Sequence, residues 1–464
     1  MNAIIFSALL GVVMMFSGIV TQNKQTITRI SWVGMLFLLI VNCLHAYGTW
    51  VIKVDTHGTL HFDSIGLIFN SIVFFAAFLF LILSGSDIEK TGIHLAEYYA
   101  LIFFVLCGVS ILTAYNGLLM LFLGIEIMTI PLYILTGADK RNLKSNEAAL
   151  KYFLMGSFST GIMLMGIALI YGATGRFEVT GGSGLAPSTG LAIRPSFLEV
   201  GGLLLLFVSM CFKVSAAPFH FWTPDVYDGA PSVFTSYMAT IVKSAGFFAF
   251  IKLFEGHTII LGDSWNLLVP MVIFLTLLIG NITAVFQQSV KRMLAYSSIA
   301  QAGFMLFALY GTNDLAKEGI LLYAFSYSLA TIGIFAILIK LKDYSLDGFN
   351  GLATQYPMVA FAGTIFLLSL AGIPLTGGFF AKYYMLSAAI KAGGIFWLVI
   401  AAILLAAVSV YYYFRVIQSM YFKKGTPEWN HPVSKSFQWA LMAVAVMVIL
   451  IGLFPTLLLN FFYF

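Results

Sequence analysis

The chain has 464 residues, of which 60% are hydrophobic and only 9% are charged, and its mean hydropathy is +0.97. This composition excludes a soluble globular protein and is typical of a chain that crosses a membrane many times. The formal net charge of +5 is spread over the loops and forms no basic tract, so nucleic-acid binding is not supported. The three cysteines stand apart in apolar runs and offer neither a disulfide framework nor a CxxC metal site.

Apolar runs of spanning length alternate with short polar turns along the whole chain. A helix needs about twenty apolar residues to cross a hydrocarbon layer roughly 30 Å thick. By this criterion the sequence predicts an all-α, polytopic membrane protein with about fourteen transmembrane helices. The predicted spans are 1–21, 28–46, 62–84, 96–114, 117–136, 147–174, 199–221, 232–254, 264–286, 292–310, 318–340, 357–390, 394–421 and 437–462.

Two of these helices, the seventh and the twelfth, are predicted to be broken near the middle of the membrane. In the seventh, Lys213 is followed five residues later by Pro218, which removes a backbone hydrogen bond. The twelfth would be about 51 Å long as one straight helix, and it carries Pro374 among glycines near its centre. Irregular backbone at membrane depth is tolerated only where protein or a wet cavity covers it, so both breaks indicate an internal site.

The two broken helices are five spans apart, and an odd offset gives them opposite orientations across the membrane. The sequence therefore predicts two inverted five-helix bundles, spans 4 to 8 and spans 9 to 13, as in many transporters. The resulting division of the single membrane domain, 1–464, is an N-terminal three-helix addition (1–95), a first antiporter-like bundle (96–254), an inverted second bundle (264–421) and a C-terminal helix (437–462).

The distribution of lysine and arginine predicts the orientation. Of the 24 such residues, fifteen follow odd-numbered spans, six follow even-numbered spans and three lie within spans. Because cytoplasmic loops are enriched in lysine and arginine, we expect both termini on the non-cytoplasmic side.

Four ionisable residues are expected at mid-depth: Glu126, Lys213, Lys243 and Lys382. A charge there costs roughly 2.5 to 3.5 kcal/mol on insertion scales and by default marks a functional site. Bringing Glu126 and Lys213 together favours the charged forms of both, so their separation sets the proton affinity of the lysine. A structural ion pair at Glu126 and Lys213, or a lysine that snorkels at Lys243 or Lys382, is the alternative. We interpret the four residues as a chain of proton sites.

Other polar residues have two readings. His220, beside Pro218, either relays protons or is satisfied by backbone at a helix end. Asp225 and Asp228 lie in TPDVYDGAPS, where turn chemistry explains them at least as well as proton uptake. The eleventh span carries hydroxyl groups that either order water or pack against neighbours. These are Tyr323, Ser326, Tyr327 and Thr331.

The sequence carries no glycine-rich nucleotide loop after a strand, no metal-ligand spacing and no nucleophile with an adjacent base. We therefore expect the chain to transport and not to transform, with no cofactor of its own. A partner or a counter-ion gradient must supply the driving force.

Four stretches carry a resemblance to a known family: GIEIMTIPLYIL, FKVSAAPFHFWTPDVYDGAPSVFTSYMATIVKSAGFF, VKRMLAYSSIAQAGF and GIPLTGGFFAKYY. Over essentially its whole length, the chain resembles the antiporter-like membrane subunits of respiratory complex I (NADH-quinone oxidoreductase), and within them the subunit N branch. The most specific stretch is TPDVYDGAPS, because subunits M and L and the cation/proton antiporters typically read PDAH with EAP there. Lysine at position 382 fits subunits N and L better than M.

The resemblance implies a proton-translocating subunit of a complex that oxidises NADH and reduces quinone in the bacterial inner membrane. It implies that Glu126 is the acid of the fifth helix, Lys213 the lysine of the broken seventh, Lys243 the relay on the eighth and Lys382 the group leading to the far side. The implied partners are subunits M, K and J and the lipid bilayer, and FMN, iron-sulfur clusters, NADH and quinone are implied in other subunits. The tenth span departs from the first bundle, because it has no acid equivalent to Glu126.

Three functions stay open from the residues: a redox-driven proton channel, a subunit of a cation/proton antiporter or a related membrane-bound hydrogenase, and a membrane scaffold that transports nothing. The charges at mid-depth favour transport over a scaffold.

Overall fold

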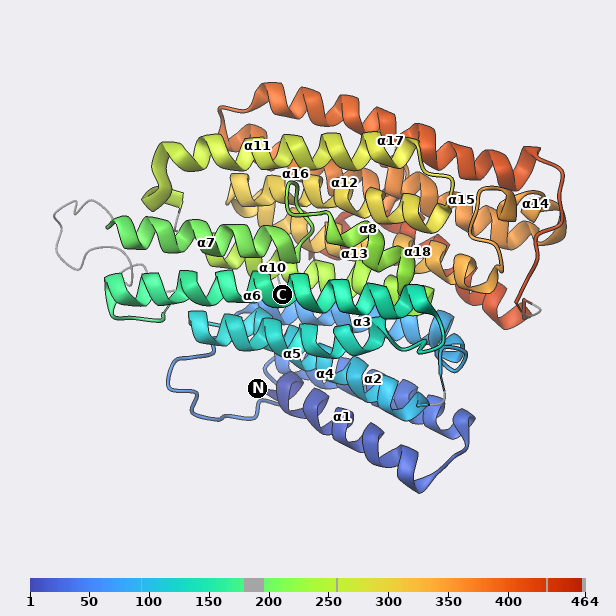
Figure 1. Ribbon diagram of the computed structural model, residues 1–464, viewed down its shortest axis with the longest axis horizontal. Coiled ribbons are helices and arrows are strands. Elements are labelled where there is room, and N and C mark those ends of the chain that lie inside the picture. Colours follow the sequence, from blue (N-terminus) through green and yellow to red (C-terminus); the bar gives the residue numbers. More distant parts are fainter. Residues whose placement is uncertain (93, 179–195, 256–257, 431–432, 461–464) are drawn as a thin grey trace.

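The computed structural model describes residues 1–92, 94–178, 196–255, 258–430 and 433–460. Within these ranges the protein is built of helices, and the long ones lie side by side along one direction (Figure 1). Helices α1 (Asn2–Val20) and α2 (Lys24–Ala46) form one edge of the molecule, and α11 (Thr258–Val285) and α17 (Phe396–Phe422) form the opposite edge (Figure 1).

Twelve helices of the described residues are long and apolar enough to cross a membrane. This confirms the predicted all-helical, multi-pass membrane protein. The prediction of about fourteen spans also counts the two broken helices, whose halves are too short for that criterion. That count stays a prediction.

The first part of the chain packs α1 against α4 (Leu95–Ala114) and α2 against α3 (Ser64–Ile88). Helix α3 also packs against α13 (Asp314–Lys340), far along the chain. At this contact the carboxylate of Asp87 is buried and lies 2.6 Å from Nζ of Lys340. The region predicted as an N-terminal addition therefore touches the centre of the molecule.

The next part of the chain contains the first broken helix, α7 (Phe197–Lys213) and α8 (Trp222–Gly229), and its neighbours along the sequence. These neighbours are α5 (Leu118–Thr136), α6 (Leu143–Thr174), α9 (Ser232–Tyr237), the π-helical turn η1 (Met238–Val242) and α10 (Lys243–Phe254). Helix α6 packs along α7, and α9, η1 and α10 run on as one apolar span from Ser232 to Phe254. Every residue of that span is buried inside the protein, so the span forms part of the centre.

The remaining part of the chain contains the second broken helix, α15 (Pro357–Ala371) and α16 (Gly377–Ala392). The other helices of this part are α11, α12 (Val290–Gly311), α13, the 3₁₀ turn η2 (Asp347–Phe349), α14 (Leu352–Gln355), α17, α18 (Lys435–Leu453) and α19 (Thr456–Asn460). Helices α12 and α13 are almost wholly buried, and α16 packs against both of them.

Polar side chains fix where several helices begin. Asn142 accepts a hydrogen bond from a backbone N–H in the first turn of α6, and Ser196 and Ser289 do the same for α7 and α12. Such N-caps satisfy donors that a helix end leaves free, which stabilises that helix end by roughly 1 kcal/mol.

The two breaks share a backbone feature. Between α7 and α8 the chain passes Ser215, and between α15 and α16 it passes Leu375, with φ of 65° and 71° respectively. Left-handed backbone is strained for both residue types and persists only where its surroundings hold it. Pro218 lies in the first interval and Pro374 in the second, and both are exposed on the surface of the chain.

The end of the chain differs from the sequence prediction. The predicted last helix, 437–462, is divided, because α18 ends at Leu453 and the short α19 begins at Thr456. Pro455 disfavours helical backbone at Phe454, whose φ of −132° and ψ of 67° are not helical. Residues 461 and 462 lie outside the described part of the chain.

Candidate functional site

Glu126 and Lys213 are linked through a third residue, Thr160. The hydroxyl of Thr160 on α6 lies 2.9 Å from Oε1 of Glu126 on α5, and Nζ of Lys213 donates to the same hydroxyl at 3.3 Å. The hydroxyl has one hydrogen, and the carbonyl of Gly156 at 3.0 Å competes for it. Glu126 and Lys213 are therefore neighbours, as predicted, but the hydroxyl of Thr160 joins them. The carboxylate and the amine do not lie within 4.0 Å of each other.

Lys213 is the last residue of α7, so the break begins at the lysine itself. The freed carbonyl of Phe212 accepts a hydrogen bond from the indole of Trp222 at 3.1 Å. On the far side of the break, the amide of Ala217 donates to Oγ1 of Thr276 on α11 at 2.9 Å. These contacts satisfy backbone groups that the break would leave unpaired, as burial in a membrane requires.

Pro218 faces the outside of the chain, not the lysine. It lines an apolar groove of about 440 Å³ together with Phe158 of α6 and Phe212. The proline therefore shapes the break from the surface, and no charged side chain is among the residues that line this groove.

Lys243 is 2% exposed, and its amine is held by one residue of the second half of the chain. Nζ donates to the carbonyl and to the hydroxyl of Ser298 on α12, at 2.9 and 3.0 Å. The lysine directly follows the π-helical turn η1. π-Helical turns are rare and occur frequently at functional sites.

Lys382 is 7% exposed and reaches back across the second break. Its Nζ donates to the carbonyls of Leu370 and Ala371, both at 2.9 Å, at the end of α15. Helix ends leave such carbonyls free and carry partial negative charge, so they suit an ammonium group. Gly372 leaves room for the lysine, because a Cβ there would lie 2.8 Å from Cδ of Lys382.

Buried polar side chains of α12 and α13 lie between these two lysines. Gln301, three residues beyond Ser298, donates to the Leu370 carbonyl that Lys382 also binds, at 2.8 Å, and accepts a hydrogen bond from Tyr323. A cavity of about 10 Å³ is lined by Gln301, Tyr323, Tyr327 and Lys382, among others. That is about the room one water molecule needs.

The hydroxyl groups of the eleventh predicted span lie in this region, on α13. Those of Ser326, Tyr327 and Thr331 are buried without a hydrogen-bond partner among the described residues. Such groups are places where ordered water binds. This favours the water-ordering interpretation of these hydroxyls over simple packing.

None of the ion pairs in the described ranges includes Lys213, Lys243 or Lys382. The three amines rest on hydroxyl and carbonyl oxygens instead. The three lysines therefore do not form buried ion pairs. Because their partners are neutral oxygens, each amine can be protonated or neutral in its site.

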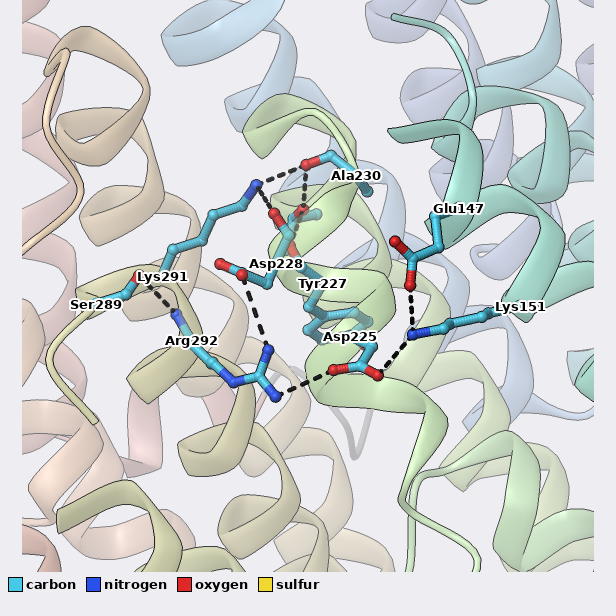
Figure 2. Close-up of polar contacts among 10 residues, drawn as sticks. Glu147, Lys151, Asp225, Tyr227, Asp228, Ala230, Ser289, Lys291 and Arg292 are labelled. Atoms are coloured by element: carbon cyan, nitrogen blue, oxygen red, sulfur yellow. Dashed lines mark hydrogen bonds and ion pairs between the residues drawn. The ribbon is translucent and has the colours of Figure 1, made fainter. Parts of the chain in front are cut away.

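Asp225 and Asp228 are not simple turn residues. The carboxylate of Asp225 on α8 lies 3.0 Å from Lys151 of α6 and 3.0 Å from Arg292 of α12, and Asp228 lies 3.8 Å from Arg292 (Figure 2). The two acids therefore fasten α8 to helices of both halves of the chain. His220, by contrast, is only partly buried and its Nδ1 has no hydrogen-bond partner in the described residues.

Sequence reasoning missed four side chains that hold the site together: Thr160, Ser298, Gln301 and Lys291. The first three are neutral, and nothing in an apolar run distinguishes a bridging hydroxyl or amide from one that packs. The sequence pattern places Lys291 among the loop lysines, but the structure buries it. The described residues also contain no group of three His, Cys, Asp or Glu side chains that could hold a metal ion.

An all-helical chain with two broken helices and a row of buried lysines at those breaks and between them is a polytopic, ion-translocating membrane protein of the antiporter-like class. Residues 114–409 match the family model described as NADH:quinone oxidoreductase/Mrp antiporter, TM. The chain belongs to this family, and within it to the NADH-quinone oxidoreductase N subunits.

The relatives cover nearly the whole chain. NADH-quinone oxidoreductase subunit N of Cytophaga hutchinsonii is 38% identical and covers 99% of each chain. The same subunit of Trichlorobacter lovleyi is 36% identical over 98% of this chain and 94% of its own length. Among solved structures, a chain of respiratory complex I from Thermus thermophilus with bound aureothin is 30% identical, with a TM-score of 0.85, and covers 99% of this chain and 98% of that one.

Proposed function

We propose that this chain moves protons across the membrane through Glu126, Lys213, Lys243 and Lys382. The chain is a proton-translocating membrane subunit of an NADH:quinone oxidoreductase complex. The observation that carries the proposed path is that all three lysines, two of them almost fully buried, rest only on neutral oxygens. An amine at this depth is costly, and ionisable residues within a membrane by default mark an ion or proton pathway.

The steps of the proposed mechanism follow the contacts. A conformational or electrostatic signal from neighbouring subunits moves Glu126 relative to Lys213, and Thr160 is the bridge that this movement makes or breaks. The separation changes the proton affinity of Lys213, because a nearby carboxylate favours the ammonium form. The proton then passes to Lys243 and, by way of Ser298 and the Gln301 cavity, to Lys382.

The finer architecture belongs to the same proposal. The two broken helices bring the number of spans to fourteen, and spans 4 to 8 and 9 to 13 form inverted five-helix bundles. Both termini face the non-cytoplasmic side of the bacterial inner membrane. This orientation rests on the excess of lysine and arginine in the loops after odd-numbered spans.

The driving chemistry is assigned to other subunits. FMN, iron-sulfur clusters, NADH and quinone are bound outside this chain, and its neighbours in the membrane are subunits M, K and J. Moving one charge against 100 mV requires about 2.3 kcal/mol. Redox chemistry in the subunits that bind FMN, iron-sulfur clusters and quinone supplies this energy.

Replacing Lys213 with alanine in the intact complex tests the path. Proton uptake into proteoliposomes is measured per NADH oxidised, with assembly checked by the content of the other subunits. We expect lower proton output and lower coupled turnover. Lys435→Ala, at an exposed helix end, is the matched control. Unchanged proton output in Lys213→Ala would remove Lys213 from the path.

The family description also names the Mrp antiporter, and the alternative is a cation/proton antiporter subunit without a redox partner, which the N-subunit relatives argue against. Purification under mild conditions separates the two. Co-purifying flavin and iron-sulfur subunits support the NADH-driven complex. Cation exchange by a purified complex that does not oxidise NADH supports the antiporter.

A further inference from the structure

Lys291 is a buried lysine that the four-residue path does not use. It is 3% exposed, and its Nζ donates to the carbonyls of Asp228 and Ala230 at 2.7 and 2.6 Å (Figure 2). Within the described ranges no carboxylate oxygen lies within 4.0 Å of this amine. It therefore shares the property that distinguishes Lys243 and Lys382, a buried amine held by neutral oxygens.

Helix α12 carries Lys291 toward Lys243. Ser289 caps the start of this helix and places Lys291 in its first turn. Ser298, which binds Lys243, lies seven residues further on, on the same helix face and about 10 Å along the axis. The residues between them on this face are Leu294 and Ala295, which are both buried.

Helix α8 and the segment that follows it also contact both Lys243 and Lys291. Tyr227 lies under Lys243, with 5.9 Å between Nζ and the ring centre, and the next residue is Asp228, whose carbonyl binds Lys291. Shortly after Ala230 come Ser232 and Ser236, both buried with hydroxyls that have no hydrogen-bond partner among the described residues. They belong to the span that continues to Lys243, so hydroxyls able to hold water lie along the chain between the two lysines.

The other side of Lys291 leads to the surface. The carboxyl groups of Asp225 and Asp228 are 39% and 29% exposed, and both pair with Arg292, the next residue after Lys291 (Figure 2). Through these partly exposed carboxyl groups, the surroundings of Lys291 reach solvent.

We propose that Lys291 is the group that loads Lys243 with a proton, by a route at the contact between the two halves of the chain. The ammonium of Lys291 gives up one proton and becomes a neutral amine, and the neutral amine of Lys243 takes one up and becomes an ammonium. The proton travels over the hydroxyls of Ser232 and Ser236 and the water they hold, and Lys291 is reprotonated past Asp228. This inference rests on the proposed function and adds an uptake route that does not pass through Lys213.

The rival role for Lys291 is structural, because the amine also satisfies carbonyls at the end of α8. Lys291→Arg separates the two roles. A guanidinium keeps a charge and several donors for the same carbonyls, but it does not give up its proton. Lys252→Arg is the matched control, since Lys252 is also buried and donates to a carbonyl, that of Thr113 at 3.0 Å.

The experiment measures proton output per NADH in proteoliposomes of the intact complex, with assembly measured by subunit content. We expect Lys291→Arg to assemble and to lose at least half of its proton output, while Lys252→Arg keeps its output. An assembled Lys291→Arg complex with full output overturns the proposal.

If Lys291→Arg does not assemble, a second variant tests the proposal. Lys291→Gln keeps two N–H donors without a titratable group, so lost output from an assembled complex supports the relay and full output overturns it. If both variants fail to assemble while Lys252→Arg assembles, Lys291 is structural and the proposal is rejected. Lys213→Ala in the same assay distinguishes this proposal from the proposed function. If Lys213→Ala loses proton output while the Lys291 variants keep it, the role of Lys291 is rejected and the path through Lys213 is retained.

Discussion

Ser298 offers Lys243 two oxygens at once, its carbonyl at 2.9 Å and its hydroxyl at 3.0 Å. Ser298 belongs to the second half of the chain and Lys243 to the first, so this contact crosses the boundary between them. Gln301, three residues further along α12, donates to the Leu370 carbonyl that Lys382 also binds. Ser298 thus lies between Lys243 of the first half of the chain and the polar groups around Lys382 of the second half.

Removing only the hydroxyl of this serine tests its part in the relay. Ser298→Ala leaves the carbonyl contact to Lys243 and removes the oxygen that passes a proton onward. A hydrogen bond to a charged group contributes about 1.5 to 3 kcal/mol, and each 1.36 kcal/mol changes a rate about tenfold, so we expect proton output to fall by about tenfold or more. The output of proteoliposomes checks this, with Ser298→Thr as the variant that keeps the hydroxyl. Equal output from the alanine and threonine variants would contradict the role.

The bridge between Glu126 and Lys213 gives a second expectation. Thr160→Val has nearly the same shape but no hydroxyl, so Glu126 and Lys213 lose their common partner. We expect the valine variant to assemble and to pump several-fold less than the wild type, because the carboxylate no longer communicates with the amine. Thr160→Ser should retain most of the activity. A valine variant with normal output would show that the hydroxyl bridge is dispensable.

Gly372 gives a third expectation, at the second break. Its φ of 83° is strained for any other residue, and an added methyl would lie 2.8 Å from Cδ of Lys382. Strain of this kind costs about 1 to 3 kcal/mol, so we expect Gly372→Ala to displace the lysine from the Leu370 and Ala371 carbonyls and to lower proton output. Gly172→Ala, where a methyl meets nothing within 4 Å, is the control and should leave output unchanged.

The ion pair between Asp87 and Lys340 gives an expectation about stability. Asp87 is buried at the end of α3 and pairs with Lys340 of α13 and with Lys90. Removing one partner of a buried pair costs about 3 to 5 kcal/mol, since the other charge stays buried. We expect Asp87→Leu to lower the thermal midpoint of the complex. The double variant Asp87→Leu with Lys340→Leu should recover most of the loss, and equal destabilisation by single and double variants would argue against a coupled pair.

The sequence by itself determined the membrane class, the helices and the position of both breaks. Runs of twenty apolar residues have no other stable arrangement in a bilayer, because a helix satisfies its own backbone hydrogen bonds. Charges within such runs are costly, which is why the apolar pattern alone marks Glu126, Lys213, Lys243 and Lys382 as candidates.

Only the tertiary structure decided what those charges touch. The partners that hold them are Thr160, Ser298 and the carbonyls of Leu370 and Ala371, which lie from 11 to 55 residues away from them along the chain. Neutral hydroxyls and backbone oxygens carry no signal in composition or spacing, so their roles follow from packing alone. Lys291 shows the same limit, because a lysine at a helix start is exposed or buried according to what another helix places over it, here the end of α8.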